Sequence, residues 1–224
     1  MPQSRLATRP RVVGVVPLEG RDGLPFVELH REALFLHSVR ALLDVEPLGG
    51  RVVVTVEAAQ RPHAEAGLAA AGLEAVVEDP GAWWQAVARP DAGAGRPVVL
   101  VHDPLCPLVP AAFLADCLTA SRGEALVAFR PVTDTLKTVV DDHIADTLDR
   151  DRFGIVASPL VFTGPSEDLT APPTHDFAAM ALWLRAHGPV TLRKAPSLGR
   201  RVDDPSAVNL LECMDEMART VRER

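Results

Sequence analysis

Short apolar segments of strand length alternate with helix-length segments through the first 130 residues of the chain. The apolar runs predict strands over Arg11–Val16, Arg51–Val56, Leu73–Val77, Pro97–Val101 and Ala125–Phe129. The residues between these runs predict helices over Arg31–Leu43, Glu57–Ala71, Gly81–Ala88 and Pro110–Ser121. Strands separated in this way by helices favour an α/β fold, with a mostly parallel sheet flanked by helices on both faces.

The pattern changes after Phe129. Two alternating segments, Lys137–Val140 and Ile144–Leu148, flank the turn-like residues Asp141–His143 and predict a β-hairpin. We interpret this hairpin as an arm, at about 136–156, that leaves a single domain over 11–224, with 1–10 as a disordered lead-in. The remaining segments predict strands over Ile155–Ala157 and Val190–Arg193 and helices over Thr174–His187 and Pro205–Arg222.

Composition excludes several classes of protein. A net charge of −7 argues against nucleic-acid binding by bulk electrostatics. No apolar run reaches the length of about 18 residues that spans a membrane, and the N-terminus lacks the apolar centre of a secretory signal. The 3 cysteines are widely spaced and form no zinc-binding motif. We therefore expect a cytoplasmic protein with reduced thiols.

Polar residues follow two of the predicted strands. The segment Val99–Val109 reads VLVHDPLCPLV and places Asp103 where a strand ends, the edge at which open α/β sheets bind ligands. Asp103 is either a Mg²⁺ ligand or a turn residue. We interpret His102 as a packed, hydrogen-bonded residue rather than a base, and Cys106 as a small apolar side chain.

The second polar group lies in Pro131–Lys137, which reads PVTDTLK. Thr133 and Thr135 could bind a substrate hydroxyl or phosphate, or could satisfy the backbone of their own loop. Lys137 could take part in such a site or could simply face solvent on the hairpin.

These two segments resemble the VHDAARPLV and PVTDTIK motifs of the 2-C-methyl-D-erythritol 4-phosphate cytidylyltransferase family, in the same order and at similar spacing. Further segments resemble the family in register: Leu29–Leu42, Thr147–Phe162, Thr174–Asp176 and Gly199–Pro205. The resemblance implies a Rossmann-like nucleotidyltransferase fold with a β-arm exchanged between the subunits of a homodimer. It also implies transfer of a cytidylyl group from CTP to 2-C-methyl-D-erythritol 4-phosphate, a step in isoprenoid precursor synthesis.

The family's site residues carry over onto matching positions. Asp103 would hold Mg²⁺, and Arg201, on the family's phosphate-binding lysine, would join it as a catalytic residue. The resemblance implies substrate binding for Thr133, Thr135, Lys137 and Arg150, of which Arg150 matches the arginine that contacts the acceptor phosphate. For Arg150 and Arg201 the alternative is a surface ion pair with Asp149, Asp203 or Asp204.

The family's CTP-binding segments are eroded. Its glycine-rich loop AAGxGxRMGxxxPKQ, whose backbone and cations surround a triphosphate, corresponds to the shorter Val16–Phe26, which reads VPLEGRDGLPF. Gly20, Arg21 and Gly23 remain as nucleotide-binding candidates, and Glu19 adds a negative charge.

The family's base-reading segment corresponds to Asp79–Val87, where its glycine pair, arginine and serine are missing. Trp83 and Trp84 could stack a base there, or a helix could bury one ring and half-expose the other.

Three hypotheses for function follow. In the first, the chain is a Mg²⁺-dependent cytidylyltransferase. In the second, it is an inactive paralogue, a dimer that binds either a phosphorylated polyol or sugar or a partner protein. In the third, it is a nucleotidyltransferase with a donor other than CTP.

Overall fold

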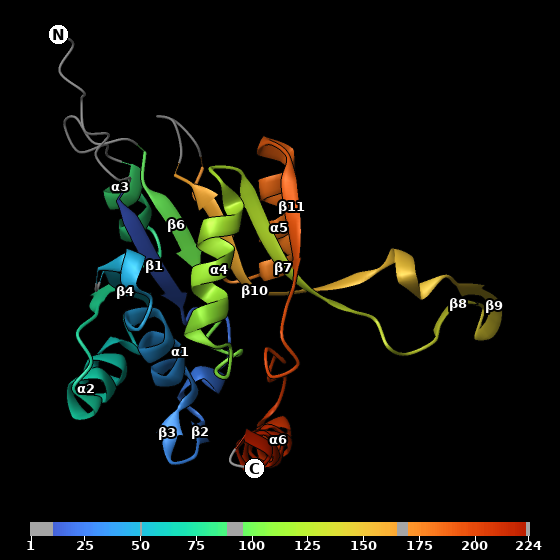
Figure 1. Ribbon diagram of the computed structural model, residues 1–224, viewed down its shortest axis with the longest axis horizontal. Helices are drawn as coiled ribbons and strands as arrows, with labels where there is room; N and C mark the ends of the chain where they lie inside the picture. Colours follow the sequence, from blue (N-terminus) through green and yellow to red (C-terminus); the bar gives the residue numbers. More distant parts are fainter. Residues whose placement is uncertain (1–10, 50, 89–95, 165–169, 223–224) are drawn as a thin grey trace, which may run out of the picture.

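The computed structural model describes residues 11–49, 51–88, 96–164 and 170–222. Its body is built on a seven-stranded sheet (Figure 1). In spatial order the strands are β11 (Val190–Lys194), β7 (Ala125–Pro131), β10 (Gly154–Thr163), β6 (Val98–Val101), β1 (Val12–Pro17), β4 (Val52–Thr55) and β5 (Val76–Glu78). All neighbouring pairs are parallel except those of β10, which runs antiparallel to β6 and β7. The predicted α/β class with a mostly parallel sheet is confirmed.

The prediction for β10 was too short. Only Ile155–Ala157 was expected as a strand, and Pro159, which cannot donate a ladder hydrogen bond, lies just beyond that range. The strand continues past Pro159 because its register with β7 shifts between Val156 and Leu160, which accommodates the proline as a bulge does.

Helices cover both faces of the sheet. One apolar core lies under α1 (Leu34–Leu43), α2 (Arg61–Ala71) and α4 (Ala111–Ser121), and the other under α3 (Ala82–Ala88) and α5 (Phe177–His187). Trp83 and Trp84 belong to the second core and are 1% and 5% exposed, so neither ring is available to stack on a base. The alternative of a half-exposed ring is equally wrong. Among the described residues no helix has the length and apolarity needed to cross a membrane.

Three helices begin three or four residues later than the sequence predicted. Residues 31–33 belong instead to a small hairpin of β2 (Glu28–Leu29) and β3 (Glu32–Ala33), which turns through positive φ angles of 52° and 66° at His30 and Arg31. Helix α2 begins at Arg61 because Pro62 is tolerated only in a first turn. Helix α5 begins after Asp176, whose carboxylate accepts the N–H groups of residues 178 and 179.

The last helix, α6 (Pro205–Arg222), packs beside the β2–β3 hairpin at the edge of the sheet where the parallel strands end (Figure 1). Three short 3₁₀ turns complete the described structure: Leu24–Phe26, Glu46–Leu48 and Arg150–Arg152.

Strands β8 (Leu136–Val140) and β9 (His143–Leu148) form the predicted hairpin, which projects away from the body (Figure 1). Its turn residues, Asp141 and Asp142, have φ angles of 47° and 61°, as a tight two-residue hairpin turn requires. The turn interpretation of these acidic residues is thus confirmed. The lead-in predicted for 1–10 lies outside the described residues.

Candidate functional site

The loops that follow β1 and β6 meet at the carboxyl edge of the sheet, around Asp103. This residue is 2% exposed, and its Oδ1 accepts the backbone N–H of Leu105 at 3.1 Å. A carboxylate that accepts the N–H two residues ahead closes an Asx-turn, so the turn role considered from the sequence is present.

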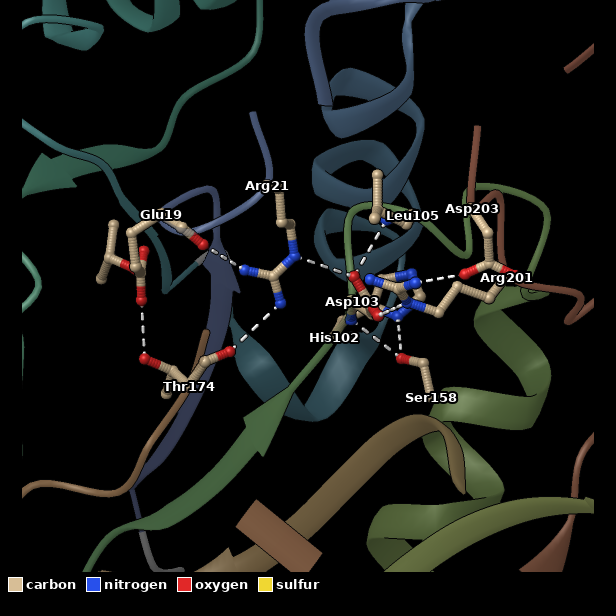
Figure 2. A network of polar contacts seen from close by, with 10 residues as sticks. Glu19, Arg21, His102, Asp103, Leu105, Ser158, Thr174, Arg201 and Asp203 are labelled. Atoms are coloured by element: carbon tan, nitrogen blue, oxygen red, sulfur yellow. Dashed lines mark hydrogen bonds and ion pairs between the residues drawn. The ribbon is translucent and has the colours of Figure 1, made fainter. Parts of the chain in front are cut away.

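Two arginines contact the Asp103 carboxylate from opposite sides (Figure 2). Arg21, on the loop after β1, donates from Nε to Oδ1 at 3.3 Å, and its side chain is 2% exposed. Arg201, on the segment before α6, donates from Nε to Oδ2 at 3.0 Å, and its side chain is 41% exposed. The loops after β1 and β6 and the segment before α6 are therefore joined through one buried carboxylate.

Arg21 is also bonded on its other two nitrogens. Nη1 donates to the carbonyl of Glu19 at 2.7 Å and Nη2 to the carbonyl of Thr174 at 3.1 Å. The guanidinium carbon lies 5.9 Å from the centre of the Phe177 ring, within cation–π range. Arg21 is thus a buried cation that holds the shortened loop against the segment before α5.

Glu19 lies on the far side of Arg21 from Asp103 (Figure 2). The residue is 7% exposed, and its carboxylate accepts the hydroxyls of Thr174 at 2.6 Å and Thr55 at 2.8 Å. The negative charge noted in the sequence is therefore buried and hydrogen-bonded.

His102 is fully buried beside the site. Its Nδ1 lies 2.5 Å from Ser158 Oγ, and Ser158 Oγ also accepts the N–H of Asp103 at 3.0 Å. Burial lowers the pKa of His102 to about 4, against the opposing effect of the Asp103 charge, so the imidazole is neutral near pH 7. The interpretation of His102 as a packed, hydrogen-bonded residue is confirmed. Cys106 is equally buried, and burial raises the pKa of its thiol.

A cavity of about 430 Å³ opens next to this network. The candidates Gly20, Arg21, Gly23 and Arg201 line it, together with Asp22, Leu24, Val27, Leu105, Asp203, Asp204 and Pro205. Arg201 also pairs with Asp203, as the surface-pair alternative expected. Burial lowers the pKa of Arg201, but Asp103 and Asp203 outweigh this effect and raise it above its ordinary value. The cavity wall therefore carries a permanent, half-exposed cation.

The site does not fit Mg²⁺ as its side chains lie. Both Asp103 oxygens already face a guanidinium, and Arg21 separates Asp103 from Glu19. No group of three or more histidine, cysteine, aspartate or glutamate side chains among the described residues is placed to hold a metal ion. Mg²⁺ prefers oxygen ligands in near-octahedral geometry, and here guanidinium groups take that place.

The remaining candidates lie on the arm or at its base, and none of them lines the cavity. Arg150 is exposed and donates from Nη1 to the Thr133 carbonyl at 2.6 Å, which ties the two ends of the arm together. Lys137 is exposed and donates to Thr147 Oγ1 at 2.5 Å across the hairpin. Thr135 is exposed as well. A single chain therefore brings five candidates together at the cavity and its network: Gly20, Arg21, Gly23, Asp103 and Arg201. It leaves Lys137 and Arg150 on the arm and Thr133 and Thr135 at its base.

Sequence reasoning missed three polar residues of the network. Thr55 ends β4, so its position at the carboxyl edge could have been inferred. Ser158 was hidden because β10 was predicted to stop before it. Thr174 belongs to a segment whose resemblance was noticed, but nothing in the sequence showed that its carbonyl and hydroxyl meet Arg21 and Glu19.

Comparison of the sequence with known proteins identifies one family. A family profile described as IspD, 2-C-methyl-D-erythritol 4-phosphate cytidylyltransferase, matches residues 20–169. A bifunctional enzyme IspD/IspF from Nitratidesulfovibrio vulgaris is 34% identical over 152 residues, which are 63% of this chain and 38% of the relative. The cytidylyltransferase of Thermus thermophilus is 39% identical over 93 residues, which are 41% of this chain and 44% of the relative. The chain thus spans less than half the length of these relatives.

Solved structures share the fold. A 4-diphosphocytidyl-2C-methyl-D-erythritol synthase superposes with a TM-score of 0.71 at 18% identity, over 92% of this chain and 99% of that one. The crystal structure of the cytidylyltransferase from Thermus thermophilus superposes with a TM-score of 0.68 at 21% identity, over the same shares of 92% and 99%. These likenesses bear on the fold alone.

Proposed function

Because this chain belongs to the 2-C-methyl-D-erythritol 4-phosphate cytidylyltransferase family, we propose that it binds a phosphorylated polyol or sugar at the carboxyl edge of its sheet without transferring a cytidylyl group to it. One observation carries the proposal. Arg201 is held by the buried Asp103 carboxylate and is still 41% exposed on the wall of an open cavity. A guanidinium fixed in this way suits the fork geometry of a phosphate group.

A thermal-shift titration with 2-C-methyl-D-erythritol 4-phosphate tests this function, with the unphosphorylated polyol as control. Binding at 100 times Kd stabilises the folded state by about 2.7 kcal/mol, which is readily measured as a rise in Tm. We expect Arg201→Met to lose the rise. Arg193→Met should keep it, because Arg193 forms a comparably exposed pair with Asp116, away from the cavity. Absence of any rise across a panel of phosphorylated polyols and sugars would reject the proposal.

We propose that the functional unit is a homodimer in which the arm of one copy reaches the cavity of the other. Within one chain the β8–β9 arm projects away from the body and from α6 (Figure 1). The arm also exposes a group of apolar side chains, between 45% and 71% each: Val139, Val140, Ile144, Phe153 and Ile155. Exposed apolar groups of this kind mark interaction surfaces. Light scattering should give the dimer mass for the wild type and the monomer mass for Ile144→Glu, whereas a wild-type monomer would contradict the arrangement.

Cytidylyl transfer is the second candidate. The motifs around Asp103 and Pro131–Lys137 favour it, because they follow parallel strands, β6 and β7, that end at the same edge of the sheet. Pyrophosphate release with CTP, Mg²⁺ and 2-C-methyl-D-erythritol 4-phosphate decides between the two. Turnover lost in Asp103→Asn would establish the enzyme. A parallel screen of other nucleoside triphosphates covers the changed donor, although the buried Trp83 and Trp84 no longer support it.

A further inference from the structure

Arg21 occupies the centre of the site rather than its rim. Its side chain is 2% exposed, and each of its three guanidinium nitrogens donates to a different buried residue: Asp103, Glu19 and Thr174. Three of the five N–H donors of the group, one from each nitrogen, are therefore used within the protein. Ligand binding would have to break these bonds before Arg21 could move.

The loop that carries Arg21 is closed tightly over the edge of the sheet. Gly20 has a φ of 69°, and a Cβ at this position would lie 3.0 Å from the Cβ of His175. Two further residues of the loop, Asp22 and Gly23, also have positive φ angles, of 46° and 77°. The backbone thus curls against the segment before α5 and delivers Arg21 to Asp103.

The buried carboxylates of the site already have partners. Asp103 faces Arg21 on one oxygen and Arg201 on the other, and the Glu19 carboxylate is satisfied by two threonine hydroxyls. A divalent cation at Asp103 would add two positive charges next to two guanidiniums, in a region shielded from solvent where like charges repel strongly.

We propose that Arg21 is a resident counter-ion that takes the electrostatic place of a divalent cation at Asp103, so that the site binds a phosphate ester without metal. This inference deepens the proposed function, on which its second half rests. Arg21 acts through Asp103 and Arg201 as a positioning residue. It also excludes the metal–triphosphate complex that a free carboxylate would recruit, and thereby selects a singly phosphorylated ligand.

Mn²⁺ is the probe for the first half, since its electron paramagnetic resonance signal reports binding directly. Wild type should leave millimolar Mn²⁺ free. Arg21→Met should gain a site at least tenfold tighter, and Arg21→Met/Asp103→Asn should lose it again. Arg193→Met, which removes an arginine from an exposed ion pair outside the site, is the charge control and should resemble the wild type. A purely structural role for Arg21 predicts no gain of Mn²⁺ binding.

A comparison of the wild type with Asp103→Asn can also overturn the proposal, so the proposal can be tested even if Arg21→Met fails to fold. Mn²⁺ binding by wild type that disappears in Asp103→Asn would show that Asp103 is a metal ligand after all. For the second half, affinity for 2-C-methyl-D-erythritol 4-phosphate should be the same within twofold in EDTA and in Mg²⁺. A tenfold requirement for Mg²⁺ refutes metal-free binding. No binding in either buffer refutes the proposed function but leaves the Mn²⁺ result standing.

Discussion

Removal of Arg21 should cost far more stability than removal of Arg201, although both contact the same carboxylate. Arg21 and Asp103 have side chains 2% and 3% exposed, so Arg21→Met leaves a buried charge with less compensation. Loss of one partner of a buried pair typically costs about 3–5 kcal/mol. Arg201 is 41% exposed, and water can replace it, so Arg201→Met should cost no more than about 1 kcal/mol.

Urea unfolding followed by tryptophan fluorescence measures both effects, because Trp83 and Trp84 are buried in the body. With a slope of about 2.5 kcal/mol per molar urea, Arg21→Met should lower the midpoint by about 1.5 M and Arg201→Met by about 0.4 M or less. Protein concentration is held fixed, since association would shift both midpoints.

A double-mutant cycle separates the ion pair from simple loss of packing. Arg21→Met should cost about 1–3 kcal/mol less in an Asp103→Asn background than in the wild type, because the charge that it leaves uncompensated is already gone. Equal midpoint shifts for Arg21→Met and Arg201→Met, or additive effects in the cycle, would refute the reasoning from burial.

Three further outcomes are expected. Gly20→Ala should destabilise the protein more than Gly23→Ala by thermal unfolding: both have positive φ, costing about 1–2 kcal/mol, but only the Gly20 Cβ meets a neighbour, His175 at 3.0 Å. Equal losses would contradict that close contact. The free energy of unfolding should fall by up to about 3 kcal/mol as pH drops from 6.5 to 4. Burial lowers the pKa of His102 to about 4 in the folded protein, so His102 of the unfolded chain takes up its proton at higher pH. His102→Gln should flatten this part of the urea-measured pH profile, and an unchanged slope would assign it to other groups. In the native protein a thiol reagent should modify Cys213 rapidly and the two buried cysteines only after unfolding; rapid modification of a second thiol would show that a core opens readily.

The sequence predicted the fold class well because burial on both faces leaves a local signal. The run of three valines at 52–54 is continuously apolar, and this pattern does not depend on which residues line the ligand-binding edge. The antiparallel β10 was underestimated because its proline breaks a local rule that only the register shift, a tertiary feature, relieves.

The sequence predicted which residues belong to the candidate site, but not the contacts between them. Asp103, Arg21 and Arg201 were each identified from motifs, while the fact that they form one ion-paired network depends on loop geometry. Short-range patterns cannot show that residues 82 and 98 positions apart share a carboxylate. The choice between Mg²⁺ ligand and turn residue was open in the sequence for the same reason.

The strands are synthesised in an order that differs from their order in the sheet. Strands β6 and β7 are complete at residues 101 and 131, but β10, which lies between them, ends only at residue 163. Until then β6 and β7 of the nascent chain each have an unpaired edge, and unpaired strand edges can form hydrogen bonds with other chains. A chain that stalls before residue 154 is therefore a candidate for aggregation, and synthesis of β10 is the event that fills the gap between β6 and β7.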